Sequence, residues 1–292
     1  MEKYLDVFTD SFVGYANYLL NELLHPSWTN YFYWLLFLSL LVYSLELIFP
    51  WRKTQNAVRK DFWLDGFYLL FNFFLLSLIG FNAVADVGVA LFNDLLLSVG
   101  ITNLVSISLA TLPAWPQLLT MFILADFMQW NIHRLLHRVP WLWNFHKVHH
   151  SVLEMGFAAQ FRFHFMESIV YKTLQYVPLA MIGFGIDQFI IIHIIAILIG
   201  HLNHANLDLD YGPLKYLLNN PKMHLWHHSK VIPNNQKYGV NYGLSLSLWD
   251  YLFGTAHVPY HDPDLELGFP GVESFPDQFH TQLVVPFKNN SS

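Results

Sequence analysis

Histidine is the residue type whose number and spacing in this chain could do chemistry. The sequence of 292 residues has 16 histidines, and 12 of them lie between positions 133 and 228. Eight of the 12 form one HxxxH pattern and two HxxHH patterns: His133 and His137; His146, His149 and His150; His224, His227 and His228. Residues three or four apart share one face of a helix, so each pattern can aim two imidazoles at one point. Neighbours such as His149 and His150 differ by about 100° and could serve two different metals.

The composition restricts what these histidines could do. The chain has no cysteine, so disulfides, thiolate zinc sites, iron–sulfur clusters and cysteine nucleophiles are excluded. A zinc ion takes about four ligands, and a mononuclear iron site often takes about three from the protein. Eight converging imidazoles therefore predict two metal ions. Neutral imidazole suits iron, zinc, copper or nickel, and the residues alone do not choose among them.

Three further histidines are candidates for the same centre. His201 and His204 end an apolar segment, where an ionisable group is costly and usually functional. We expect His204 to be a ligand. His201 stays open between a ligand and a hydrogen-bond partner of one, and His164 between a ligand and a ring that bonds to a carboxylate or a backbone group. The isolated histidines are expected to be ordinary core or surface residues: His25, His193 and His280.

The remaining composition points to a membrane. Hydrophobic residues make up 54% of the chain and charged residues 12%, about half the charge of a typical soluble domain. The long apolar segments predict membrane-spanning helices at these positions: 28–50, 62–84, 112–130, 168–184 and 188–200. The last two are joined by a short glycine-containing turn and are expected to form a hairpin, while 87–99 is amphipathic and suits the interface.

The distribution of charge predicts the orientation. Basic residues fill the loop 51–61 and then recur only from Arg134 onward. The positive-inside rule places this loop and the histidine-bearing region on the cytoplasmic side of a multi-pass protein, in a bacterial inner membrane or the endoplasmic reticulum. The net charge of −6 comes without a basic patch, so we expect no nucleic acid partner.

The predicted fold is an all-α integral membrane protein. It has about four transmembrane helices plus a re-entrant-type hairpin, and a cytoplasmic helical cap carries the histidine boxes. The cap is expected from about position 211, where proline, asparagine and glycine replace the apolar runs.

In this order and spacing, the histidine patterns resemble those of the fatty acid hydroxylase / sterol desaturase superfamily. The resemblance covers about residues 120–256 and includes other elements of the family: Asp126 before the His133-Arg134 box, His164 and Glu167 with Phe165 in place of the expected proline, His204-Ala205-Asn206, Asn241-Tyr242-Gly243, and Trp249 to Thr255. Residues 1–110 match only as generic membrane helices.

The resemblance implies a di-iron centre that uses O2 and electrons from a separate electron-transfer protein, and zinc could replace iron in a recombinant preparation. The implied substrate is a membrane lipid (a sterol, a fatty acyl chain or a related lipid), which is hydroxylated or desaturated. The implied metal ligands are His133, His137, His146, His149, His150, His204, His224, His227 and His228. The expected domains are 1–111 (membrane spans and connection), 112–256 (fatty acid hydroxylase-like catalytic region) and 257–292 (cytoplasmic tail).

Two other classes of protein could use the same residues. A metal-dependent membrane hydrolase needs a general base, for which Glu154 and Glu167 are candidates, but the HExxH motif is absent. A metal transporter needs a polar path, and the predicted spans carry few acids: Glu46, Asp65 and Asp126. Turnover that depends on oxygen would separate the oxidase from both.

Overall fold

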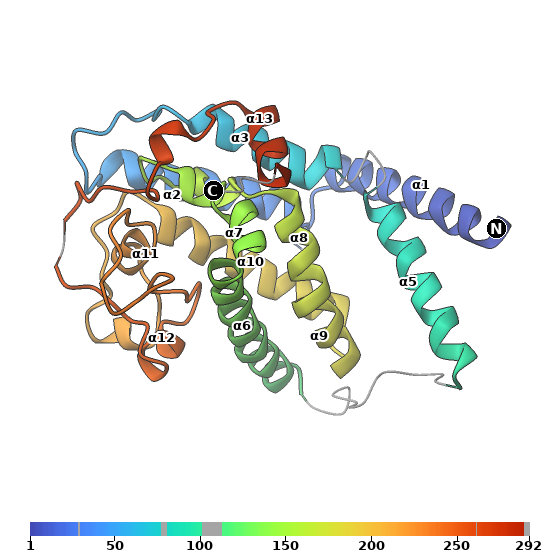
Figure 1. The fold of residues 1–292 in the computed structure, drawn as a ribbon. Helices are drawn as coiled ribbons and strands as arrows, with labels where there is room; N and C mark the ends of the chain where they lie inside the picture. The colour runs from blue at the N-terminus through green and yellow to red at the C-terminus, as the bar shows by residue number, and fades with distance from the viewer. Residues whose placement is uncertain (29, 77–80, 101–112, 261, 289–292) are drawn as a thin grey trace.

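Helices joined by long loops make up the fold in a computed structural model (Figure 1). The structure describes residues 1–28, 30–76, 81–100, 113–260 and 262–288. Within these ranges, extended backbone forms only three isolated β-bridges and no sheet. The all-α prediction is confirmed.

One helix among the described residues is long and apolar enough to cross a membrane. This helix is α2 (Tyr31–Ile48), within the predicted span 28–50. Shorter apolar helices correspond to two other predicted spans: α3 (Phe62–Leu70), which continues into a π-helical turn at Phe71–Leu75, and α10 (Ile186–His204). Residues 77–80 of the predicted span 62–84 lie outside the described residues. The number of crossings stays a prediction.

The predicted segments 112–130 and 168–184 are also helical. The first is α6 (Ala114–Arg138), which runs on past the predicted end and so carries the HxxxH pattern; residue 112 lies outside the described residues. The second contains the end of α8 (Phe165–Tyr171), a π-helical turn and α9 (Val177–Ile182). Gly183 ends α9 with φ 103°, a left-handed conformation that suits glycine, and α10 follows at once.

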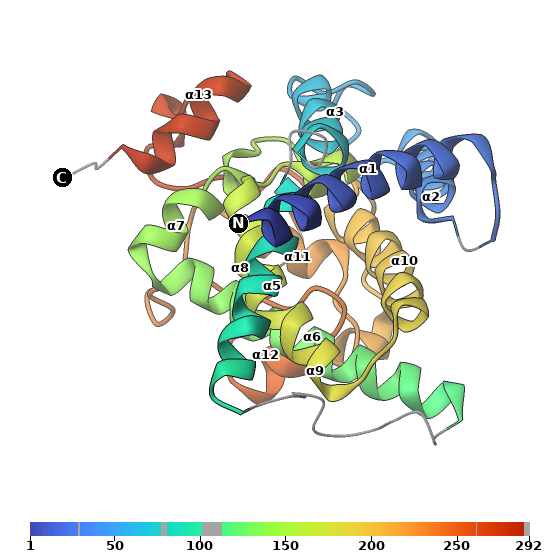
Figure 2. The same cartoon turned by 90° about the vertical axis from the view of Figure 1, so that its right-hand side faces the viewer.

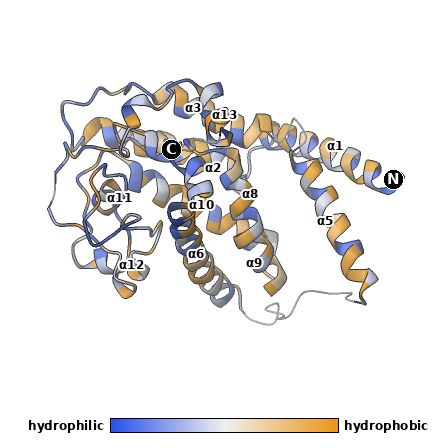
Figure 3. Cartoon of the chain, in the orientation of Figure 1, coloured by the Kyte–Doolittle hydropathy of each residue, from blue (hydrophilic) through white to orange (hydrophobic). Residues whose placement is uncertain are grey.

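Two helices form an arm that projects from the body (Figures 1 and 2). They are α1 (Glu2–Leu24), which the sequence patterns did not predict, and α5 (Phe81–Ser98), which contains most of the predicted interfacial segment 87–99. Polar groups meet between them, as in the Lys3–Asp94 ion pair of 2.6 Å. Hydrophobic residues run along both helices (Figure 3). Residues 101–112 of the predicted connection lie outside the described residues.

Short helices and turns build the region around the C-terminal ends of α6 and α10, which we call the covering region. The long helices form the bundle. The covering region consists of α7 (Pro140–His146), 3₁₀ turns at His149–Ser151, Phe157–Phe161 and Gly212–Tyr216, α11 (Pro221–His227), α12 (Leu248–Leu252), a 3₁₀ turn at Val272–Ser274, α13 (Phe279–Val284) and a final 3₁₀ turn at Val285–Phe287. The largest apolar core cluster joins α2 and α10 to the Phe157–Phe161 turn, so this turn fastens the covering region to the bundle.

A carboxylate of α6 holds the loop that leads into α12. Asp126 accepts hydrogen bonds from the backbone N–H groups of Ser245 (3.0 Å) and Leu246 (3.2 Å) and from Nε1 of Trp249 (2.9 Å). Because Asp126 is buried, these donors replace water as its partners. The carboxylate therefore fixes this loop against the bundle.

Asp250, in α12, also holds this loop against α6. Replacing Asp250 by alanine is expected to destabilise the protein by roughly 3–5 kcal/mol. The buried carboxylate accepts from the backbone N–H groups of Tyr242 (2.9 Å) and Gly243 (2.7 Å), Nε1 of Trp130 (3.0 Å) and the Thr255 hydroxyl (2.6 Å). Alanine would leave several buried donors unpaired. Thermal unfolding in detergent measures the effect, and an unchanged midpoint would contradict it.

Candidate metal centre

Nine buried histidine side chains gather where α6, α7, α10 and α11 meet. They form two donor sets, in each of which the available ligand atoms all lie within 4.8 Å of one another. Site A contains His133, His137, His146, His150 and His227. Site B contains His149, His204, His224 and His228. These nine are the residues expected as ligands from the sequence, and each is at most 9% exposed.

The local structure sends adjacent histidines to different sites. Because α7 ends at His146 and a 3₁₀ turn follows, His149 enters site B while His150 enters site A. The second HxxHH pattern divides in the same way, with His227 in site A and His228 in site B. Neither HxxHH pattern serves one ion alone, so both patterns tie the two sites together.

Imidazole nitrogens within each site approach one another as ligands of one ion would. In site A the Nε2 atoms of His133 and His146 are 3.1 Å apart, as are those of His150 and His227. Site B has Nε2–Nε2 distances of 2.9 Å for His204–His224, 3.2 Å for His224–His228 and 3.3 Å for His149–His204. Two nitrogens bound at about 2.1 Å to one ion lie about 3.4 Å apart at a tetrahedral angle and about 3.0 Å apart at a right angle. The residues therefore fit two metal ions.

One short loop segment, 238–242, orients three rings of site A. Its alternate carbonyl oxygens accept Nδ1–H hydrogen bonds: Tyr238 from His137 (3.0 Å), Val240 from His227 (2.8 Å) and Tyr242 from His133 (2.7 Å). A carbonyl can only accept, so each Nδ1 carries the proton and each Nε2 keeps a lone pair for a metal. Gly239, with φ 126°, lies within this segment, where a Cβ atom would come 3.3 Å from Nδ1 of His137.

Three other rings have acceptors on different elements. His149 donates from Nδ1 to the carbonyl of Arg162 (3.0 Å), and His204 to the carbonyl of Gly200 one turn earlier on α10 (2.8 Å). His146 donates instead to a carboxylate oxygen of Glu167, at 2.7 Å. These contacts fix the ring orientations before any metal binds.

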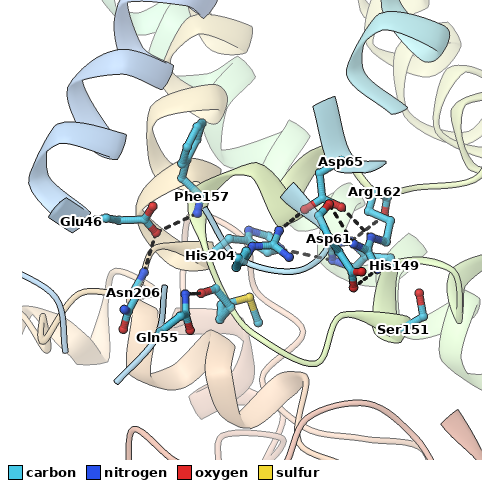
Figure 4. Close-up of polar contacts among 12 residues, drawn as sticks. Glu46, Gln55, Asp61, Asp65, His149, Ser151, Phe157, Arg162, His204 and Asn206 are labelled. Carbon is cyan, nitrogen blue, oxygen red and sulfur yellow. Dashed lines mark hydrogen bonds and ion pairs between the residues drawn. The ribbon is translucent and has the colours of Figure 1, made fainter. Parts of the chain in front are cut away.

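A buried ion-pair cluster lies behind His149 (Figure 4). The guanidinium of Arg162 donates to Asp65 (2.6 Å) and Asp61 (3.1 Å), and Arg59 also pairs with Asp65. Asp65 is one of the few acids in the predicted membrane spans. Its two arginine partners, Arg59 and Arg162, show that it fastens α3 to the loop whose carbonyl receives His149.

The two histidines left open by the sequence lie outside both sites. His164 caps α8: its Nδ1 accepts from the Met166 N–H (3.2 Å), and its Nε2 donates to the Leu283 carbonyl (3.0 Å). His201 places Nε2 3.0 Å from the hydroxyl of Ser39 on α2. Both rings therefore have structural partners, and neither contributes a nitrogen to the donor sets.

Burial controls the protonation of the donor sets. The cost of burying a charge lowers the pKa of His133 to about 3 and that of His149 to about 4, and it lowers the pKa of the other site A rings as well. The same cost raises the pKa of Glu167 to about 7. The rings are thus neutral near pH 7, the form in which imidazole binds metals.

The metal-free protein is expected to lose stability as the pH falls below about 6.5, the pKa of histidine in an unfolded chain. Between the unfolded and folded pKa values the unfolded state binds more protons, so acid favours unfolding. His149 alone, with its folded pKa of about 4, would contribute about 3 kcal/mol across this window. Protonation of Glu167 has the opposite effect: because its pKa is higher in the folded state, it stabilises the fold as the pH falls from about 7 to 4.5. Glu167 is a single group, however, whereas many histidines have lowered pKa values. Unfolding midpoints at pH 7.5, 6.5 and 5.5 test this, and a flat profile would contradict it.

The fold and the site together define the class of protein. It is an all-helical protein with two adjoining donor sets that consist only of histidines. Residues 118–255 match the family model for fatty acid hydroxylase. This match, which covers somewhat under half of the chain, and the relatives described next support a relationship to the fatty acid hydroxylase superfamily.

Relatives with assigned activities match parts of this chain. Ornithine lipid hydroxylase OlsE of Rhizobium tropici is 35% identical over 176 residues, which is 59% of this chain and 52% of that protein. Alkylglycerol monooxygenase of Xenopus tropicalis is 32% identical over 143 residues, 48% of this chain and 30% of that protein. Very-long-chain aldehyde decarbonylase GL1-6 of Oryza sativa subsp. japonica is 28% identical over 142 residues, 44% of this chain and 21% of that protein. The chain thus spans about half the length of OlsE and less of the others, and no solved structure gives a significant match.

Proposed function

We propose that the protein is an O2-dependent lipid hydroxylase with one iron ion in site A and one in site B. The observation that carries the proposal is the pair of buried donor sets, whose Nε2 atoms lie 2.9–3.3 Å from one another. Two of the relatives are named hydroxylase and monooxygenase, which favours oxygen insertion over desaturation.

The residues of the chain would have three tasks in this reaction. The nine imidazoles hold the ions, and the carbonyl groups and Glu167 keep those rings in place. Iron held by these rings would provide the redox chemistry that oxidation of a C–H bond by O2 requires and that side chains alone cannot provide, with the two electrons drawn from the separate donor protein. The burial of all nine rings keeps bulk water away from the reacting groups.

We propose a membrane lipid with a polar head group as the substrate. The relatives' names specify an ornithine lipid and an alkylglycerol, which are lipids of this kind. The donor sets lie at the ends of the apolar helices α6 and α10, where a lipid chain in the bilayer and its head group could both approach. We further propose a multi-pass arrangement with the centre on the cytoplasmic side, and a separate protein as electron donor.

The intramembrane acids favour the oxidase over a transporter. Glu46 accepts hydrogen bonds from the backbone N–H groups of Phe157 (2.8 Å) and Asn206 (2.7 Å). Asp65 pairs with arginines, and Asp126 accepts from the loop before α12. All three side chains are engaged in holding loops, so none is free to line an ion path. The general base required by a hydrolase has a similar problem, because Glu167 is engaged by His146.

Incorporation of oxygen from ¹⁸O2 tests the proposal. Membranes that contain the protein are incubated under ¹⁸O2, and their lipids are compared by mass spectrometry with those from a His146→Ala, His227→Ala variant. The expected result is a lipid with one added ¹⁸O atom, formed only by the unsubstituted protein. Iron content and Mössbauer spectra of purified protein are measured in parallel. Protein without iron, or product formed equally by the variant, would exclude the proposed centre.

A further inference from the structure

The two donor sets differ in number and in the groups that support them. Site A has five histidines and site B has four. In site A, the ring of His146 donates to the Glu167 carboxylate, and three others donate to the carbonyls of the 238–242 segment.

Site B has weaker support from its surroundings. The acceptors for His149 and His204 are backbone carbonyls, which carry no net charge. The Nδ1 atoms of His224 and His228 are buried and have no hydrogen-bond partner within the described part of the chain. Fewer contacts therefore hold the rings of site B at the angle that a metal requires.

Glu167 is itself held rigidly. Its Oε1 atom accepts the backbone N–H of His164 at 3.2 Å, which closes the capping box of α8, while Oε2 accepts from His146 at 2.7 Å. The side chain is 3% exposed, so water competes little for it. The fold therefore holds one carboxyl group in a fixed position against one ring of site A.

A carboxylate that accepts from a metal-bound imidazole makes the ring a stronger donor. Loss of such a partner typically costs about 10–100-fold in metal affinity. The effect is local, because it passes through one ring to one ion. In a centre whose ligands are otherwise neutral, this carboxylate also offsets part of the charge of the ion that its ring binds.

We propose that the two metal positions are inequivalent and that Glu167, acting through His146, makes site A the tighter one. Glu167 is in this view a positioning residue for site A alone. The inference deepens the proposed function, since it rests on metal binding by the two donor sets.

Zinc titration of full-length, chelator-stripped protein in detergent tests the inference. The His204→Ala variant, with three rings left in site B, is used to measure site A, and a His133→Ala, His137→Ala variant, with three rings left in site A, is used to measure site B. Adding Glu167→Gln, which keeps an acceptor but removes the charge, is expected to weaken zinc binding about 10–100-fold in the first variant and to leave it unchanged in the second. Glu46→Gln is the matched control, because it changes a partly buried carboxylate that contacts backbone N–H groups and none of the nine rings.

Mössbauer spectra cover the case in which a histidine variant fails to fold. Protein with Glu167→Gln as its only substitution is loaded with ⁵⁷Fe, and one of two quadrupole doublets is expected to move while the other stays. Equal zinc affinities at the two sites, or doublets that move together or not at all, would overturn the inference. Those results would leave the proposed lipid oxidation standing, because the ¹⁸O2 experiment decides it separately.

Discussion

Replacing His204 by alanine is expected to abolish lipid oxidation and to lower the bound metal from about two ions per chain to about one. The Nε2 atom of His204 lies 2.9 Å from that of His224 and 3.3 Å from that of His149, so it belongs to the centre of site B. With three rings left, site B would lose affinity while site A keeps all five of its own. Metal analysis by mass spectrometry and the ¹⁸O assay measure the two effects.

His201→Ala is the matched control for this variant. His201 lies one turn earlier on the same helix and is equally buried, but its ring packs against Phe157 and Phe161 and its Nε2 lies beside the hydroxyl of Ser39. We expect this variant to keep both metals and to lose only about 1–3 kcal/mol of stability. Loss of one metal in both variants would show that the assignment of His204 to site B does not explain the result.

Much of the candidate site was predictable because its information is local. The i, i+4 spacing brings His133 and His137 to one side of α6, and His224 and His228 to one side at the end of α11, whatever the rest of the fold does. The partition between two sites was harder to predict. It depends on where α7 ends, and on how α11 sits against α6 and α10, which are tertiary facts.

The supporting groups could not be predicted from the sequence. The acceptors at Tyr238, Val240 and Tyr242 are backbone carbonyls, and every residue type carries one. The pairing of Asp65 with Arg162 joins residues 97 positions apart, so periodicity could not reveal it. Among the supporting groups, only Glu167 could be singled out from the sequence. It lies three residues after His164, and this pair resembles an element of the family.

The helices, too, could be predicted from the sequence only in part. Apolar runs correctly indicated α2, α6 and α10, because a run of that length has few other stable forms. The helix α1 was missed because its hydrophobic residues alternate with acids and polar groups, and some of the polar groups, such as Lys3 and Ser11, bond to acids of α5. An amphipathic helix of this kind is defined by its neighbour as much as by its own sequence.

Replacing Arg162 by methionine is expected to destabilise the protein by roughly 3–5 kcal/mol and to weaken site B more than site A. Arg162 is 1% exposed and pairs with Asp65 and Asp61, so methionine would leave Arg59 as the remaining basic partner of the buried Asp65. The Arg162 carbonyl is also the acceptor for His149, and a shift of this backbone would turn that ring away from site B. Thermal unfolding and zinc titration measure the two effects, with Lys3→Met as the control. The Lys3–Asp94 pair is exposed to solvent on the projecting arm, so the control should leave the unfolding midpoint and both zinc affinities unchanged. If Arg162→Met weakened both sites equally, the ion-pair cluster would support the whole fold and have no separate connection to His149.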